Sequence, residues 1–351
     1  MSARFLTTAD AEEWERALPA SRSAFGSLGF ARVQERAGGP EPRLLIADTD
    51  ACRVAYPLGL RSLGDLPFTA KSQSARADSV SPPFTGPIVL EGEASPESSD
   101  ATEEIATLFH AEGVVAEFAH LHPWGSEPAL VGGGEPDREI VWVDVAQKAE
   151  RLWESYSKAC RKNIRRAGRE GVVVRVATIP GDVAEFHRIY TATMERNEAS
   201  EAYLFDEPYF QAIFEEMPDS ARFVLAERGS EVIAATLYLH DDDDVYSYLG
   251  GADHAHQQVR PTNAVVHETI AWAREAGKKR LILGGGYRAD DGIFRFKASF
   301  SPLRATLELA RRVHLRGEYD LLVEAWRGHY GDAPDGGYFP AYRQPPPGTS
   351  E

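Results

Sequence analysis

One stretch near the C-terminal end combines glycines, a lysine and a group of phenylalanines. Gly284–Gly286 follow the apolar run LIL, and Lys297 stands among Phe294, Phe296 and Phe300. The glycines lack the G-x-G-x-x-G spacing of a dinucleotide loop, so they predict a strand end where the backbone can pass close to a substrate. A lysine among aromatic residues is either a cation that snorkels from a packed strip or a fixed ammonium beside a reacting centre.

A second stretch gathers positive charge in a chain whose net charge is −16. Residues 149–171 predict one helix, because apolar side chains from Trp153 to Ala167 recur at steps of three and four. The opposite face is basic. It is either a solvated surface or a site for an anionic ligand, such as a phosphate-bearing molecule or an RNA backbone. Its cations are Lys158, Arg161, Lys162, Arg165, Arg166 and Arg169.

Other reactive side chains predict no metal site and no covalent intermediate. Cys52 and Cys160 are the two cysteines, too few for a disulfide framework, and they lack a C-x-x-C spacing for zinc. His120-x-His122 and His254-x-His256 have no evident carboxylate partners at ligand spacing, so we expect ordinary loop or strand histidines and no cofactor. The sequence contains no G-x-S-x-G elbow, which argues against an acyl-enzyme.

Composition sets the frame for these groups. A chain of 351 residues with 43% hydrophobic and 26% charged residues is typical of a soluble globular protein, and its length favours two domains. The acidic balance argues against a general nucleic-acid binder but allows one local basic face. The N-terminus has no apolar signal region and no stretch approaches the length of a membrane span, so we expect a cytoplasmic protein without membrane insertion.

An internal repeat indicates the elements that position these residues. RLLIAD at 43–48 resembles RFVLAE at 222–227, and a short turn and a second apolar run follow each segment, as in a β-hairpin. EEIATLFHAEG at 103–113 resembles HETIAWAREAG at 267–277, and each predicts a helix that ends at glycine before an apolar strand. Hairpin, helix and strand therefore occur twice, either through duplication, which we favour, or by chance.

These elements predict two α+β domains side by side. Helices are expected before the hairpins, at 11–21, 184–196 and 208–217. An additional loop is expected at 71–87, and the Pro- and Gly-rich tail from Asp332 is expected to be an extended strap. The run Asp241–Asp244 predicts an exposed turn. We expect a first domain at 1–142 plus 305–351 and a second at 143–304 that carries the main site.

The order of several motifs resembles a known family. WESYSKACRKNIRRAGREGVVV, YTATMERN, VYSYLGGA and LILGGGYRADDGIFRFKASF follow one another as in the Fem-type transferases, with weaker copies of family segments in the first half. These are non-ribosomal aminoacyltransferases of the GNAT superfamily, built from two tandem GNAT-like domains. The resemblance implies that fold, and it implies transfer of an aminoacyl group from aminoacyl-tRNA to an amine acceptor. The heptad-rich coiled-coil arm of some Fem-type enzymes is not visible here.

The resemblance also implies roles for individual residues. Lys297 matches the lysine near the reacting centre, where an ammonium would stabilise the oxyanion formed by amine attack, with Phe296 beside it as a second catalytic candidate. Arg196 resembles a position that holds acceptor phosphates. Asp290 and Asp291 are weak candidates for a general base. The substrate-binding candidates in or near the matched motifs are Arg196, Tyr203, Tyr248, Gly285, Tyr287 and Arg295.

The donor and the activity have alternatives. Between Asp253 and Thr262 there is no glycine, and Pro261 removes a backbone donor, which disfavours the phosphate loop of a CoA enzyme. The favoured reading is an aminoacyltransferase that acts on a peptidoglycan precursor or a natural-product intermediate. The second is an acyl-CoA-dependent N-acyltransferase acting on a small amine or sugar amine. The third is a non-catalytic GNAT-like binding protein.

Overall fold

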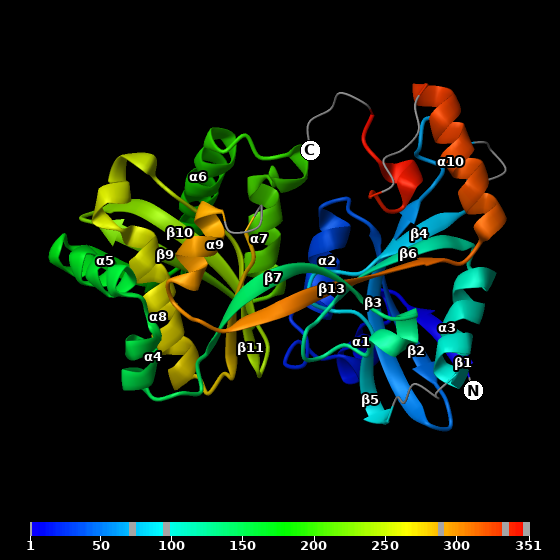
Figure 1. The fold of residues 1–351 in the computed structure, drawn as a ribbon, viewed down its shortest axis with the longest axis horizontal. Coiled ribbons are helices and arrows are strands. Elements are labelled where there is room, and N and C mark those ends of the chain that lie inside the picture. Colours follow the sequence, from blue (N-terminus) through cyan, green and yellow to red (C-terminus); the bar gives the residue numbers. More distant parts are fainter. Residues whose placement is uncertain (1, 70–74, 94–98, 287–290, 332–336, 347–351) are drawn as a thin grey trace. The chain divides into compact units, whose positions relative to one another are not determined.

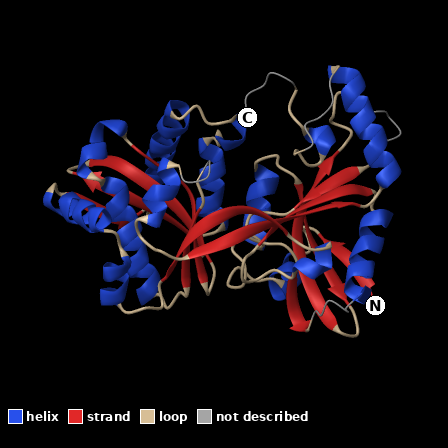
Figure 2. Cartoon of the chain, viewed as in Figure 1, coloured by secondary structure: helices blue, strands red, loops and turns tan. Residues whose placement is uncertain are grey.

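The computed structural model describes residues 2–69, 75–93, 99–286, 291–331 and 337–346. The chain forms two compact units (Figures 1 and 2). Unit 1 comprises 1–19, 25–137 and 307–351, and unit 2 comprises 20–24 and 138–306. Each unit is a mixed sheet with helices packed on it, as expected for an α+β protein. Within the described residues, no helix is long and apolar enough to cross a membrane.

The strands of unit 1 lie in the order β1-β2-β3-β4-β6-β13, and β5 pairs with β3. Helices α1 and α2 cover one face of this sheet and α3 covers the other, as the two apolar cores on the unit show. The strands are β1 (Ser2–Leu6), β2 (Glu41–Asp48), β3 (Cys52–Ser62), β4 (Ala77–Val80), β5 (Ile88–Gly92), β6 (Val114–Leu121) and β13 (Arg304–Val313). The helices are α1 (Ala11–Ala17), α2 (Leu28–Arg36), α3 (Ser99–Ala111), α10 (Arg316–Tyr330) and the short turns η2 (Pro128–Val131) and η5 (Ala341–Arg343).

The strands of unit 2 lie in the order β7-β12-β11-β10-β9-β8, which repeats the pattern of unit 1. The strands are β7 (Glu135–Asp144), β8 (Val172–Val176), β9 (Ala221–Arg228), β10 (Glu231–His240), β11 (Asp244–Ala252) and β12 (Arg280–Gly284). The helices are α4 (Ala149–Ser155), α5 (Lys158–Arg169), α6 (Pro180–Arg196), α7 (Glu207–Glu216), α8 (Pro261–Glu275), α9 (Gly292–Ala298), η3 (Glu201–Tyr203) and η4 (His254–Val259).

Alternation along β9 explains the layers of unit 2. Val224 and Ala226 belong to the core under α4, α5 and α8, whereas Phe223 meets Phe186 of α6 in an edge-to-face contact at 5.1 Å. Because successive residues of a strand point to opposite faces, the sheet buries apolar surface on both sides. Helices α6 and α7 cover one face, and α8 with its neighbours covers the other (Figure 1).

The last strand of each sheet is supplied by a chain segment that adjoins the other unit. Strand β7 follows unit 1 in the chain but pairs with β12, from Arg280↔Asp144 to Gly284↔Val141. Strand β13 follows unit 2 but pairs with β6, from Glu308↔Leu121 to Val313↔Ala116. The repeat is therefore a pair of similar sheets with exchanged final strands.

The predicted repeat is present, since β2–β3 and β9–β10 are antiparallel hairpins and α3 and α8 are the matching helices. Three expectations are corrected. The loop predicted at 71–87 contains β4. The helix predicted at 149–171 is broken between α4 and α5, because Tyr156 is extended and the Ser157 side chain caps α5 by accepting from the Cys160 N–H at 3.1 Å. The tail forms the turn η5 instead of remaining extended.

The aspartate run is also not an exposed turn throughout. Asp241 and Asp244 are 5% and 3% exposed. The Asp241 carboxylate accepts hydrogen bonds from the Asp244 N–H at 2.8 Å and the Tyr246 hydroxyl at 2.9 Å. The Asp244 carboxylate accepts two from Arg280, at 2.5 and 2.9 Å. Asp244 therefore ties β11 to β12 through a buried ion pair with Arg280. The carboxylate of Asp241 instead accepts hydrogen bonds from Asp244 and Tyr246 of β11, which offset the cost of its burial.

Candidate functional site

The site begins where the parallel strands β11 and β12 stop pairing. Their ladder runs only from Asp244↔Arg280 to Tyr246↔Ile282, although β11 continues to Ala252. Beyond this point the ladder stops, so the backbone groups of β11 and β12 no longer pair with each other; we call this end of the ladder the notch. A notch of this kind at the carboxyl ends of parallel strands is a place where an extended ligand can take up backbone hydrogen bonds.

A β-bulge places Tyr248 at this notch. Leu249 pairs with Leu237 and Ser247 pairs with Tyr238, so Tyr248 has no opposite residue on β10. A bulge turns a side chain away from the regular alternation of the strand. The Tyr248 hydroxyl lies 2.8 Å from that of Tyr209 on α7. Burial and the neighbouring Tyr209 raise the pKa of Tyr248 well above its ordinary value, which keeps its hydroxyl protonated at neutral pH.

Lys297 reaches the end of β12 from the short helix α9. Its Nζ donates a hydrogen bond to the Gly285 carbonyl at 2.7 Å. A Cβ on Gly284, whose φ of +81° already favours glycine, would stand 3.3 Å from this Nζ. Burial lowers the pKa of Lys297 to about 8, against the opposing effect of Asp291. The ammonium is therefore charged at neutral pH but partly desolvated, which strengthens its interaction with a developing anion.

The phenylalanines around Lys297 are placed as a hydrophobic wall. Phe300 is fully buried and meets Phe296 edge to face, with ring centroids 5.4 Å apart. Phe294 and Phe296 pack against the core of unit 2, and Arg304 lies over the Phe294 ring at 5.2 Å. The three rings thus belong to the apolar core on which α9 packs, which gives Phe296 a packing contact there, and the lowered pKa of Lys297 reflects the burial of its own side chain.

The remaining candidates are distributed around the same strand ends. The Arg196 guanidinium donates to the Ala252 carbonyl at the end of β11, at 3.3 Å. Tyr203 is 48% exposed, and its carbonyl accepts a hydrogen bond from the Tyr190 hydroxyl at 2.5 Å. Gly285 is needed for close packing, because a Cβ there would lie 2.9 Å from the Glu139 carbonyl oxygen of β7. Arg295 lies exposed on α9.

Of the remaining candidates Tyr287, Asp290 and Asp291, the structure describes one. Tyr287 and Asp290 lie outside the described residues. Asp291 caps α9 by accepting from the Phe294 N–H at 2.7 Å. This carboxylate thus has a structural function that requires no proton transfer.

The basic helix α5 divides into structural and available cations. The Arg161 guanidinium donates to the carbonyls of Trp153, Glu154 and Tyr156, at 3.2, 3.0 and 2.7 Å, and so holds the end of α4. Arg165 lies over the Trp153 ring at 5.2 Å, and Arg166 is 3.9 Å from Glu170. The exposed cations Lys158, Lys162 and Arg169 have no ion-pair partner in the part of the chain that the structure describes.

The loop before α8 is wound into the 3₁₀ turn η4, which commits most of its backbone donors. The Arg260 N–H bonds the Gln257 carbonyl at 3.1 Å and the Ala255 N–H bonds the Asp253 carboxylate at 2.8 Å. Pro261, the first residue of α8, has no N–H. A pyrophosphate needs several free N–H groups at a helix N-terminus, and this loop offers few.

Unit 1 lacks an equivalent notch because hydrogen bonds close it. After the parallel pair β4/β6, the Ser81 N–H bonds the Phe118 carbonyl at 3.0 Å and the His120 N–H bonds the Ser81 hydroxyl at 2.7 Å. The Thr85 N–H then bonds the His120 carbonyl at 3.2 Å. The site is thus confined to unit 2 among the two repeats.

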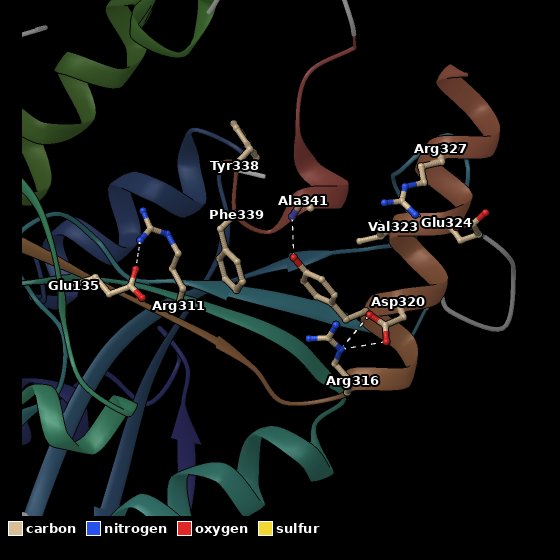
Figure 3. Close-up of a pocket in the computed structure, with 12 residues that line it drawn as sticks. Glu135, Arg311, Arg316, Asp320, Val323, Glu324, Arg327, Tyr338, Phe339 and Ala341 are labelled. Atoms are coloured by element: carbon tan, nitrogen blue, oxygen red, sulfur yellow. Dashed lines mark hydrogen bonds and ion pairs between the residues drawn. The ribbon is translucent and has the colours of Figure 1, made fainter. Parts of the chain in front are cut away.

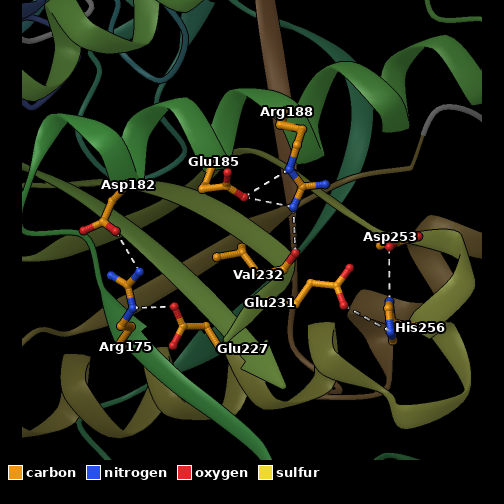
Figure 4. Close-up of polar contacts among 9 residues, drawn as sticks. All are labelled: Arg175, Asp182, Glu185, Arg188, Glu227, Glu231, Val232, Asp253 and His256. Atoms are coloured by element: carbon orange, nitrogen blue, oxygen red, sulfur yellow. Dashed lines mark hydrogen bonds and ion pairs between the residues drawn. The ribbon is translucent and has the colours of Figure 1, made fainter. Parts of the chain in front are cut away.

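The histidines show one arrangement that the sequence pattern does not indicate. Nδ1 of His256 lies 3.1 Å from Asp253 and its Nε2 lies 3.8 Å from Glu231 (Figure 4). The three side chains are close enough to consider a metal ion. However, each ring nitrogen faces a different carboxylate, so the imidazole lies between the two acids, hydrogen-bonded to Asp253 and within ion-pair distance of Glu231. Tyr209, which contacts the candidate residue Tyr248, is not indicated by the sequence, since its segment has the periodicity of a core helix.

Comparisons with known proteins identify the fold of the chain. Residues 154–298 match the model of the acetyltransferase (GNAT) domain family. The solved structure of FemX aligns with 92% of this chain and 99% of its own, at a TM-score of 0.67 and 13% identity. The chain has the Fem-type tandem GNAT fold.

Two further solved structures have a fold similar to that of this chain. The C-terminal domain (DUF2156) of a putative lysylphosphatidylglycerol synthetase from Agrobacterium fabrum covers 90% of this chain and 97% of its own, with a TM-score of 0.54 and 14% identity. A conserved protein of unknown function from Bacteroides thetaiotaomicron covers 88% and 98%, with a TM-score of 0.53 and 12% identity. No curated protein sequence matches the chain. The predicted α+β fold with two tandem GNAT-like domains is confirmed.

Proposed function

We propose that this protein is an aminoacyltransferase that forms an amide between an aminoacyl group carried by tRNA and an amine acceptor. The observation that carries the proposal is the notch between β11 and β12, with the Lys297 ammonium fixed 2.7 Å from the Gly285 carbonyl at its edge. An acyl carbonyl in this notch would have a partly desolvated cation beside the oxygen that becomes anionic. The reaction would take place in the cytoplasm, where charged tRNA is made.

In the proposed reaction the acceptor nitrogen attacks the ester carbonyl carbon and forms the C–N bond. The resulting oxyanion is stabilised by the Lys297 ammonium. The bond to the ribose oxygen then breaks, and the amine proton leaves to solvent or to that oxygen, so no cofactor is consumed. The Tyr248 hydroxyl, which Tyr209 orients, is a neutral donor for the substrate, and Arg196 is suited to an anionic part of the acceptor.

Two features support tRNA as the donor. The loop η4 commits its N–H groups internally, which disfavours a pyrophosphate at α8. The exposed cations Lys158, Lys162 and Arg169 form a surface suited to a phosphate backbone. The acceptor is proposed to be a peptidoglycan precursor or a natural-product intermediate with a free amine.

A second candidate is an acyl-CoA-dependent N-acyltransferase acting on a small amine or sugar amine. The match of residues 154–298 to an acetyltransferase domain favours it. The two candidates share Lys297 and the notch, and they differ in how the donor is held.

The test is product detection by mass spectrometry with amine acceptors and either total charged tRNA or acetyl-CoA. The proposal predicts a product that requires charged tRNA, disappears on RNase treatment and is unaffected by CoA thioesters. Product from acetyl-CoA alone, insensitive to RNase, would establish the second candidate instead. No product with either donor would favour a non-catalytic binding protein.

A further inference from the structure

A separate cavity of about 890 Å³ lies wholly within unit 1, between α10 and the chain segment Gly337–Ala341 (Figure 3). Its size is within the range of ligand-binding pockets. One wall is a single face of α10, because Arg316, Tyr319, Asp320, Val323, Glu324 and Arg327 recur at helical spacing. The opposite wall carries Tyr338 and Phe339, and Arg311 with Glu135 closes one end.

The floor of this cavity is held in place by its own contacts. The Tyr319 hydroxyl accepts a hydrogen bond from the Ala341 N–H at 3.2 Å. The Tyr319 ring stacks with Phe339 at 6.1 Å and meets the buried Tyr342 edge to face at 5.3 Å. A ligand would therefore find an aromatic surface that is already ordered, which reduces the entropy lost on binding.

The rim, in contrast, consists of weak ion pairs. Arg316 pairs with Asp320 at 3.1 Å although these side chains are 76% and 56% exposed, and Arg327 pairs with Glu324 at 3.4 Å. Arg311 pairs with Glu135 at 2.7 Å. Exposed pairs of this kind contribute only about 0–1 kcal/mol each, so a ligand can replace them at little cost.

The charge balance of the rim selects the class of ligand. Three arginines and three carboxylates line the cavity, so their formal charges cancel. An anionic ligand would be repelled by three carboxylates and a cationic one by three guanidinium groups. A molecule with both signs can meet each group with its opposite.

The length of the charged face indicates how large that molecule is. Arg316 and Arg327 are eleven residues apart on α10, which corresponds to roughly 16 Å along the helix. An extended peptide covers this distance with about five residues. We propose that this cavity binds a short extended peptide with at least one acidic and one basic side chain and an apolar side chain on the aromatic floor.

The test is a selection from a pentapeptide library with blocked termini, so that only side chains carry charge. The full chain is immobilised, incubated with the library and analysed by mass spectrometry of the retained peptides. The proposal predicts enrichment of peptides that carry both charges on separate residues. Enrichment of purely acidic peptides, or no enrichment, would overturn it.

Variants connect the binding to this cavity. The affinity of an enriched peptide should fall about tenfold in the double variant Arg316→Gln/Arg327→Gln, because two exposed charge contacts are lost. The control is Arg188→Gln in unit 2, which removes a surface pair with Glu185 at 3.0 Å (Figure 4) and should leave affinity unchanged. Unchanged affinity in the double variant would place the peptide elsewhere and overturn the proposal.

A charge exchange gives an independent readout. Glu324→Arg/Arg327→Glu retains the net charge of the rim but reverses its order. The enriched peptides should then show a changed spacing or order of charges, and an identical selection would contradict the proposal. Neither experiment uses aminoacyl transfer, so the peptide site and the proposed transferase activity succeed or fail separately.

Discussion

Lys297 combines a charge with apolar surroundings, and the proposed reaction uses that charge only after attack on the carbonyl. Lys297→Met retains much of the side-chain bulk and removes the ammonium. We expect the single-turnover rate to fall by about a hundred- to a thousandfold, the usual loss for one oxyanion donor, with little change in substrate binding. A rate close to that of the unmodified chain would remove Lys297 from the site.

The pKa of Lys297 provides a second prediction at this scale. Because the folded value is lowered to about 8, an unfolded chain binds more protons between pH 8 and the ordinary lysine value of about 10.4. Deprotonation of Lys297 in the folded chain therefore adds nothing to the unfolding free energy below pH 8, and its stabilising contribution grows as the pH rises above 8. Unfolding free energy measured against pH should rise more steeply in the native chain than in Lys297→Met over this window.

The same titration separates two roles in catalysis. If the ammonium stabilises the oxyanion, the rate should fall as pH rises through about 8, and if the neutral amine were a base it should rise. Lys297 is a candidate from its aromatic neighbours and the family motif, and its role stays a prediction. Its partner at the Gly285 carbonyl and the pairing of Tyr209 with Tyr248 could not be predicted, because they depend on a bulge and on contacts between distant segments.

At the scale of elements, the turn Asp241–Asp244 distinguishes a buried charge from an exposed one. Asp244→Ala leaves Arg280 without its bidentate partner and should destabilise unit 2 by about 3–5 kcal/mol. Its neighbour Asp243 pairs with Lys279 in an exposed bridge at 2.8 Å. Asp243→Ala should therefore cost less than about 1 kcal/mol in the same denaturant titration. Equal losses of unfolding free energy in the two variants would show that burial of the ion pair does not determine its contribution to stability.

The cations of helix α5 differ in their contacts, so substitutions should affect either tRNA binding or stability. Lys162→Ala/Arg169→Ala should weaken binding of a bulk tRNA probe and lower the slope of log affinity against log salt, by up to about 0.7–0.9 per lost cation, without changing the melting temperature. Arg161→Ala should mainly lower the melting temperature, because three carbonyl groups lose their donor. An unchanged salt slope in the first variant would show that this face of α5 does not bind tRNA and is an ordinary solvated surface.

The elements differ in how well the sequence predicts them. The hairpins and α3, α6, α7 and α8 follow from periodicity and their start and stop signals. The break between α4 and α5 is not visible in the sequence pattern, because Tyr156 keeps the apolar spacing of a continuous helix although its backbone is extended. The cap that Ser157 provides for α5 is seen only in the structure. Helix α10 is not among the predicted elements, and the burial of Asp241 and Asp244 depends on the distant Arg280 and on the Tyr246 hydroxyl.

At the scale of the molecule, the exchanged final strands predict unequal autonomy of the two halves. Residues 138–306 contain nearly all of β7 and the whole of β8 to β12, so this fragment should unfold cooperatively by circular dichroism. Residues 1–137 lack β13 and also α10 with its core contacts to β6, and should not, unless a peptide covering residues 304–351 is added. Cooperative unfolding of 1–137 alone would contradict this dependence on β13.

The exchanged final strands also determine the order in which the two sheets can be completed during translation. The nascent chain delivers β7 before the rest of its sheet, so unit 2 can close as soon as β12 has emerged. The sheet of unit 1 is made first but waits for β13, with the edge of β6 unpaired through the synthesis of more than 180 further residues. An unpaired edge invites association with other chains. Of the two units, the one translated earlier is thus completed later, and a chaperone would have most to protect in unit 1.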